Sequence, residues 1–102
     1  MKPPENFTRI INRTRYNVAT AALIASDAYW DGHNFERSGR NSFLYRTPKG
    51  NFFFVYLTCW QGERDTLEPA TQDEAIEAYE GNLSEHDVSY TVAFPNVTIA
   101  DA

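Results

Sequence analysis

Several features that would assign a chain to a functional class are scarce in this sequence. It has one cysteine, Cys59, in 102 residues, so no internal disulfide can form, which is typical of a protein in a reducing cytosol. Its longest apolar-rich stretch, residues 18–25, is far shorter than the roughly 20 residues of a membrane span. The first five residues lack the apolar core of a signal peptide. We therefore expect a cytoplasmic protein that does not bind membranes.

Recognisable catalytic and metal-binding motifs are also missing. The five glycines form neither a G-x-G-x-x-G fingerprint nor a P-loop, and no G-x-S-x-G is present. His33 lies in a long loop and His86 between Glu85 and Asp87, and neither group has the ligand spacing of a known metal site. Cys59 falls in an apolar strand, where a buried and inert thiol is expected. The sequence predicts no enzyme, no metal and no cofactor.

Basic residues are scarce in the last part of the chain. Residues 1–62 carry eight Lys or Arg and four Asp or Glu, whereas residues 63–102 carry ten acids and one base, Arg64. The two parts have net charges of +4 and −9, which give the total of −5. A separation of charge of this size indicates more about binding partners than about the fold. It disfavours general nucleic-acid binding, although a local basic patch could still contact phosphate.

The apolar residues predict one α+β domain over residues 1–102, with loose ends at 1–6 and 96–102. The first half begins with a strand at 7–11 and a polar turn at 12–16. Asn17 is a good N-cap, and the apolar positions after it recur at helical spacing, which predicts a helix at 18–29. A long loop at 30–41 follows.

The second half predicts a hairpin, a helix and a last strand. Strands at 42–47 and 52–60 flank a Pro-Lys-Gly-Asn turn, and 67–69 is a brief edge segment. A capping box at Thr71 and Glu74 starts a helix at 72–80, and alternating residues at 88–94 predict a strand. The expected fold is a small antiparallel sheet of three to five strands, centred on the hairpin 42–60, with two helices packed on it. Strand 52–60 is apolar on both faces, so both are covered or one is a contact surface, for example of a homodimer.

Two sets of charged residues are candidates for partner binding. The acidic set, in which three members share one face of the predicted helix 72–80, comprises Glu63, Asp65, Glu68, Asp73, Glu77, Glu80, Glu85 and Asp87. The basic set, interleaved with Phe35, Phe43 and Tyr45, comprises Arg37, Arg40, Arg46 and Lys49. Like charges held close together cost stability, which suggests a partner for the acidic set. The plain alternative is a solvated surface. The basic set could grip phosphates or stack on bases, or could simply solubilise a loop and an edge strand.

Three stretches of the chain resemble a family of short bacterial proteins that are widespread in phages and other mobile elements. They are residues 15–21 (RYNVATA), 44–53 (LYRTPKGNFF) and 71–75 (TQDEA). The family pattern is Y-[DN]-T-x-T-A, then L-Y-R-T-x-x-G-x-[YF]-F, then T-x-[DE]-E-A. The resemblance covers about residues 13–80 and departs from the pattern at Val18, where Thr is usual, and in the loop 30–41. These motifs are caps and a turn, so they imply fold and genomic setting more than activity.

The resemblance makes an inhibitor of host defence plausible, because small phage proteins include anti-CRISPR proteins. Such inhibitors are often acidic and non-enzymatic, and they occupy the nucleic-acid-binding surface of a Cas protein. We expect the acidic segment to lie where phosphate normally lies on a Cas effector. Exposed aromatic anchors would be Trp30, Trp60 and Tyr79. The alternative is a nucleic-acid-binding accessory or regulatory protein of a mobile element that uses the basic set.

Overall fold

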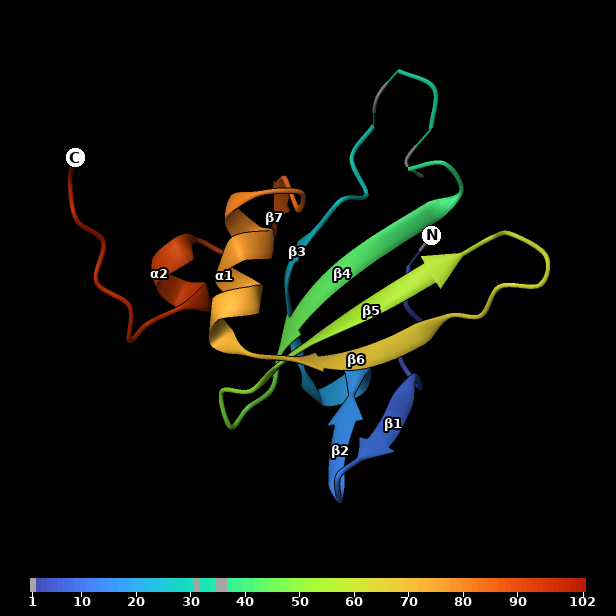
Figure 1. The fold of residues 1–102 in the computed structure, drawn as a ribbon, viewed down its shortest axis with the longest axis horizontal. Helices are drawn as coiled ribbons and strands as arrows, with labels where there is room; N and C mark the ends of the chain where they lie inside the picture. The colour runs from blue at the N-terminus through green and yellow to red at the C-terminus, as the bar shows by residue number, and fades with distance from the viewer. Residues whose placement is uncertain (1, 31, 35–36) are drawn as a thin grey trace.

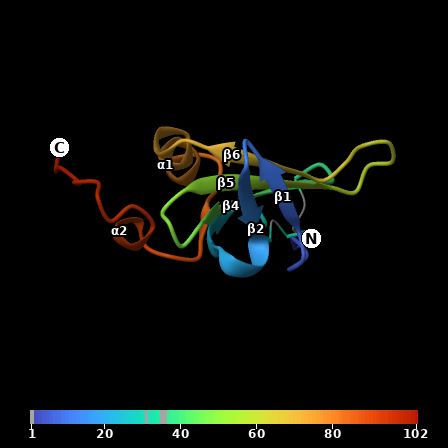
Figure 2. The ribbon, with the colours of Figure 1, turned by 90° about the horizontal axis from the view of Figure 1, so that it is seen from below.

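A five-stranded antiparallel sheet forms the middle layer of the protein in the computed structural model, which describes residues 2–30, 32–34 and 37–102 (Figure 1). A two-stranded hairpin packs on one face of this sheet, and two short helices pack on the other. In Figure 2, helix α1 lies on one side of the sheet, and the turn after β2 lies on the other. The α+β class and the antiparallel sheet predicted from the sequence are confirmed.

The described part of the chain consists mainly of short strands that pair antiparallel. In chain order they are β1 (Thr8–Ile11), β2 (Thr14–Asn17), the 3-10 helix η1 (Val18–Thr20), β3 (Ala22–Ser26), β4 (Arg40–Arg46), β5 (Phe52–Thr58), β6 (Thr66–Ala70), α1 (Gln72–Glu80), β7 (Glu85–His86) and α2 (Tyr90–Ala93). Strands β1 and β2 pair with each other, and the large sheet has the order β6-β5-β4-β3-β7. The chain therefore places β6 and β7 at opposite edges of one sheet.

The prediction of a helix at 18–29 is wrong. Asn17 does cap a turn, because its side chain accepts a hydrogen bond from the backbone N–H of Ala19 at 3.0 Å, but this turn is a 3-10 helix of three residues. Strand β3 follows and pairs with β4. Its register shifts between Leu23 and Ala25, so Ile24 and Ala25 both join the same core cluster. A bulge of this kind breaks the alternation of a strand, and the remaining apolar pattern imitates a helix.

The central hairpin is confirmed. Strands β4 and β5 pair from Arg46 opposite Phe52 to Arg40 opposite Thr58. In the turn between them Gly50 has a φ of +88°, a conformation that favours glycine. The backbone N–H of Gly50 donates to the carbonyl of Thr47 at 2.9 Å, which closes the turn.

Both faces of β5 pack against other parts of the chain. The helix-side cluster consists of Ile24, Ala25, Leu44, Phe52, Ala75, Tyr79, Leu83, Ala93 and Phe94. The hairpin-side cluster consists of Val18, Phe43, Tyr45, Phe53, Val55, Leu57 and Leu67. The hairpin-side residues Phe53, Val55 and Leu57 are buried, whereas Phe54 and Tyr56 on the helix side are only half-buried.

Helix α1 matches the prediction at both ends. The Thr71 side chain accepts from the N–H of Glu74 at 3.1 Å, and the Glu74 carboxylate accepts from the N–H of Thr71 at 2.9 Å. This reciprocal pair fixes the start of the helix. The edge segment expected at 67–69 is confirmed as part of β6.

Two other predictions in the end regions are wrong. The residues expected to turn at 12–16 include most of β2, because the chain reverses at Asn12 and Arg13, which both have positive φ. The strand expected at 88–94 is instead the short helix α2. Ala93 and Phe94 are both buried although they are neighbours, while Val92 is 61% exposed, so the burial does not alternate as it would in a strand.

Among the described residues, no helix is long and apolar enough to cross a membrane.

Replacing Phe53 should test the burial of β5 on its hairpin side. Phe53 is fully buried and its ring stacks on Tyr45 at 5.2 Å between centroids. We expect Phe53→Ala to lower the free energy of unfolding by about 3–5 kcal/mol. Ile10→Ala is the control, because Ile10 is 62% exposed and its loss should cost about 0.5 kcal/mol or less. Urea denaturation followed by circular dichroism measures both, and equal losses would contradict the described packing.

Candidate functional site

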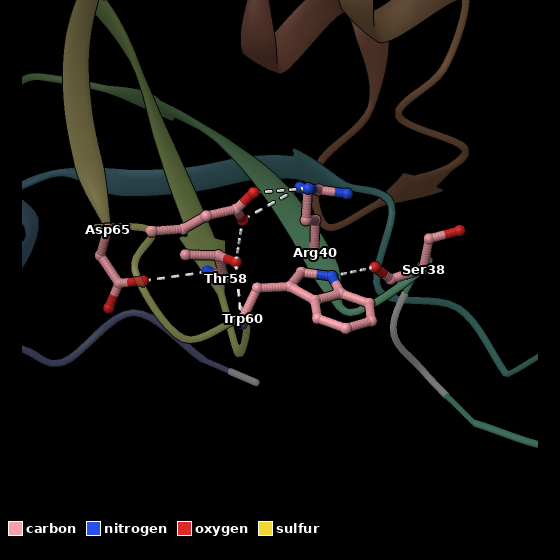
Figure 3. Close-up of polar contacts among 6 residues, drawn as sticks. Ser38, Arg40, Thr58, Trp60 and Asp65 are labelled. Atoms are coloured by element: carbon pink, nitrogen blue, oxygen red, sulfur yellow. Dashed lines mark hydrogen bonds and ion pairs between the residues drawn. The ribbon is translucent and has the colours of Figure 1, made fainter.

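Two acids of the predicted set are engaged inside the molecule, in the connection between β5 and β6. The Glu63 carboxylate pairs with the Arg40 guanidinium at 2.5 Å and accepts from the Thr58 hydroxyl. Asp65 accepts from the backbone N–H of Thr58 at 2.9 Å (Figure 3). The hydrogen bond from Arg40 lowers the pKa of Glu63, and Glu63 raises the pKa of Arg40. Arg40, Glu63 and Asp65 thus join the end of the central hairpin to β6.

Three other carboxylates gather around two aromatic rings on the helix side of the sheet. Glu68 lies opposite Phe54 across the β5–β6 pair, so both side chains point to the same face. Glu74 and Glu77 line a hollow of about 380 Å³ together with Phe54. The half-buried rings of Phe54 and Tyr56 stack, with centroids 5.7 Å apart. We call this group, Phe54, Tyr56, Glu68, Glu74 and Glu77, the acidic surface.

The pKa values agree with this grouping. Burial raises the pKa of Tyr56, and the charges of Glu68 and Glu74 raise it further. The hydrogen bonds of the capping box lower the pKa of Glu74, so this carboxylate stays ionised at neutral pH. None of the three carboxylates forms an ion pair with a residue that the structure describes.

The rest of the acidic set lies elsewhere. Asp73 and Glu80 are exposed at the two ends of α1, and Glu80 accepts from the Tyr90 hydroxyl at 2.8 Å. Glu85 and Asp87 lie at or beside β7, with β5, β4 and β3 between them and β6. The acidic segment is therefore divided between the two edges of the sheet and does not form one continuous field.

The aromatic anchors differ in exposure. Trp30 and Trp60 are 57% and 53% exposed, as expected. The Trp60 indole N–H donates to the carbonyl of Ser38 at 2.6 Å, which holds its ring over the loop (Figure 3). The expectation that Tyr79 is exposed is wrong, because it is 5% exposed and stacks on His86 with centroids 3.7 Å apart. Tyr79 lies on the inner face of α1 and cannot anchor a partner.

The predicted basic set does not form one surface. Arg37 lies 4.0 Å over the Tyr29 ring and donates to the carbonyl of the same residue, and Arg40 pairs with Glu63 as described above. The guanidinium of Arg46 lies against the turn at Gly50. Of the aromatic residues interleaved with this set, Phe43 and Tyr45 are buried and cannot stack on bases, and Phe35 lies outside the described residues.

The structure instead joins Lys49 to two arginines that the sequence did not single out. Arg13 and Arg15 of the β1–β2 hairpin line a groove of about 420 Å³ together with Lys49 of the β4–β5 turn. Among the described residues none of these three cations forms an ion pair. We call them the basic groove. The sequence does not group these residues, because Arg13 and Arg15 are far from Lys49 in the chain. The hairpin that brings them together turns at Asn12 and Arg13, whose positive φ values cannot be predicted from a pattern of apolar residues.

The candidates for chemistry are dispersed. Cys59 is exposed, which contradicts the buried position expected for it, because β5 ends one residue earlier at Thr58. His86 Nε2 lies 2.8 Å from the carbonyl of Tyr79, a structural contact between β7 and α1. In the described part of the chain no three His, Cys, Asp or Glu side chains are placed to hold a metal ion.

No family model matches this chain, and comparisons with curated proteins and with solved structures found no match either.

Replacing Glu63 should change stability in a pH-dependent way. The lowered pKa of Glu63 means that its contacts stabilise the fold fully above the unfolded-state pKa, and that this stabilisation is lost as the pH falls through the folded-state pKa. Glu63→Gln should therefore lower the thermal midpoint at pH 7, and the difference from wild type should disappear in acid. Thermal unfolding across this pH range measures the effect, with Glu5→Gln, in the exposed N-terminal segment, as the control. A difference that persists in acid would contradict the assignment.

Proposed function

We propose that this protein is a small non-enzymatic binding protein that uses its acidic surface to engage a basic surface of a partner protein. The observation that carries the proposal is the gathering of Glu68, Glu74 and Glu77 around Phe54 and Tyr56, without ion pairs among the described residues. Carboxylates without ion pairs beside these rings would attract a cationic group of a partner. The two half-buried rings add an apolar centre to the contact.

The chemistry of this surface favours arginine on the partner. A guanidinium can form paired hydrogen bonds with a carboxylate and can stack on an aromatic face at the same time. The backbone edge of β6 is a poor docking site, because Pro69 removes a hydrogen-bond donor and Glu68 brings charge. Contact through side chains rather than by strand addition is therefore the expected mode.

Protein surfaces rich in arginine commonly bind nucleic-acid phosphate. An acidic surface that occupies such a region would exclude the nucleic acid by competition. The resemblance to short phage and mobile-element proteins makes a CRISPR–Cas effector the first candidate partner, and inhibition of host defence in the host cytoplasm the first candidate role. This role rests on the resemblance and on the charge pattern together.

Neutralising the acidic surface should weaken binding to such a partner. We expect the triple variant Glu68→Gln, Glu74→Gln and Glu77→Gln to lose about tenfold or more in affinity, since each close charge pair contributes 1.5 kcal/mol or more in measured complexes. Glutamine at position 74 can still complete the capping box, so the helix is preserved. Titration of purified nucleic-acid-free Cas effector complexes across a range of salt concentrations measures the effect.

The matched control carries the same change in net charge at other places. Glu5→Gln, Glu85→Gln and Asp101→Asn together remove three negative charges outside the acidic surface. This control should bind nearly as well as wild type. Equal losses in the two triple variants, or binding that does not weaken with salt, would show that the acidic surface does not make the contact.

The basic groove supports a second candidate function, direct contact with nucleic acid. Arg13, Arg15 and Lys49 line one groove together with three threonines, and a phosphate group there could accept from the cationic side chains. The groove belongs to the basic first part of the chain, so the negative net charge of the whole protein does not exclude it. It would act on the backbone of DNA or RNA without reading sequence.

Nucleic-acid binding through the groove should depend steeply on salt. If it occurs, Arg15→Gln with Lys49→Gln should reduce the slope of log affinity against log salt by about 2 on duplex DNA. The control pair, Lys2→Gln with Arg64→Gln, has the same charge change outside the groove and should leave the slope nearly unchanged. Gel retardation at low salt measures both, and no retardation of DNA or RNA by the wild type would remove this candidate.

A further inference from the structure

A pocket of about 460 Å³ opens at the β7 edge of the sheet, on the hairpin side. Its volume falls within the range of small-molecule sites. The floor is apolar and is formed by Leu23, Ala28 and Phe43, with the ring of Tyr45 beside them. Because Phe43 and Tyr45 are anchored in the hairpin-side cluster, the floor is held rigidly by the core.

The hydroxyl of Tyr45 is the unusual feature of this pocket. Tyr45 is 5% exposed, and its ring is fixed by stacking on Phe53 at 5.2 Å between centroids. Its hydroxyl forms no hydrogen bond with the described residues and is not sealed from solvent, so it is open to a group that enters the pocket lined by Tyr45. Burial raises the pKa of Tyr45 to about 12, so the hydroxyl stays protonated at neutral pH and can both donate and accept.

The rim of the pocket carries two acids and one base. Glu85 and Asp87 line it from the β7 side, and Lys2 lines it from the N-terminal segment. Burial and the neighbouring charge of Glu85 raise the pKa of Asp87, while Lys2 lowers it. The net charge of the rim is negative, and a further cation placed there would favour the ionised form of Asp87.

We propose that this pocket binds a small organic cation, a primary amine or guanidine carried on a compact apolar body. The apolar body would lie on Leu23 and Phe43, the cation would lie between Glu85 and Asp87, and the Tyr45 hydroxyl would accept from the cationic group. The site is separate from the acidic surface, which lies on the other face of the sheet and near its other edge. It therefore stands whether or not the proposed partner binding is correct.

Two ligands of similar shape and opposite charge test the proposal. Tryptamine carries an amine on an indole, and indole-3-acetate carries a carboxylate on the same ring system. In a titration followed by amide chemical shifts, tryptamine should shift the signals of Leu23, Tyr45 and Asp87 with a saturable dependence. Indole-3-acetate should bind at least about tenfold more weakly. Equal binding of the two, or tryptamine shifts outside the pocket, would overturn the proposal.

Two variants assign the effect to the named groups. Asp87→Asn should weaken tryptamine binding about tenfold, and Tyr45→Phe, which keeps the stacked ring, should weaken it about fivefold. Glu77→Gln, on the opposite face, has the charge change of Asp87→Asn and should bind tryptamine as the wild type does. Unchanged binding in both pocket variants would refute the assignment. Saturable binding of a lysine-containing peptide without binding of tryptamine would assign the pocket to a protein partner instead.

Discussion

The arrangement of this protein depends on one constraint, that strand β5 is apolar on both of its faces. Phe53, Val55 and Leu57 must be covered on one side, and Phe52 must be covered on the other. The covering layers come from the segments before β3 and after β6. The N-terminal hairpin packs on one face, and helices α1 and α2 pack on the other. This division into layers sets the positions of the acidic surface, the basic groove and the pocket at Tyr45.

The same layered arrangement decides where the basic and acidic parts of the chain lie in the folded protein. The basic N-terminal part supplies the hairpin layer, where Arg13 and Arg15 meet Lys49. The acidic C-terminal part supplies the helix layer, where Glu74 and Glu77 meet Phe54. Charge that is separated along the sequence is therefore partly separated between the two faces of the sheet, although Glu85 and Asp87 line the pocket on the hairpin side. Such a molecule orients itself in the field of a charged partner before contact.

Charged residues of this protein fall into two kinds, and sequence counts do not distinguish them. Arg40, Glu63 and Asp65 satisfy one another and the backbone at Thr58, so they contribute to the structure of the β5–β6 connection. Glu68 and Glu77 have no such partner among the described residues, and they flank half-buried aromatic rings. Only the second kind has unused capacity for a partner, which is why the proposed function rests on the acidic surface and not on total charge.

Elements whose signals are local could be predicted from the amino-acid sequence. The turn at Gly50 set the central hairpin, and the capping box of Thr71 and Glu74 set α1, because these interactions join residues only a few positions apart. The other features depend on contacts between distant parts of the chain. The bulge in β3 depends on pairing with β4, and the exposure of Cys59 and the burial of Tyr79 depend on where neighbouring elements end and pack. The acidic surface, the basic groove and the pocket at Tyr45 each join residues distant in sequence, and no local pattern encodes which distant side chains a folded sheet brings together.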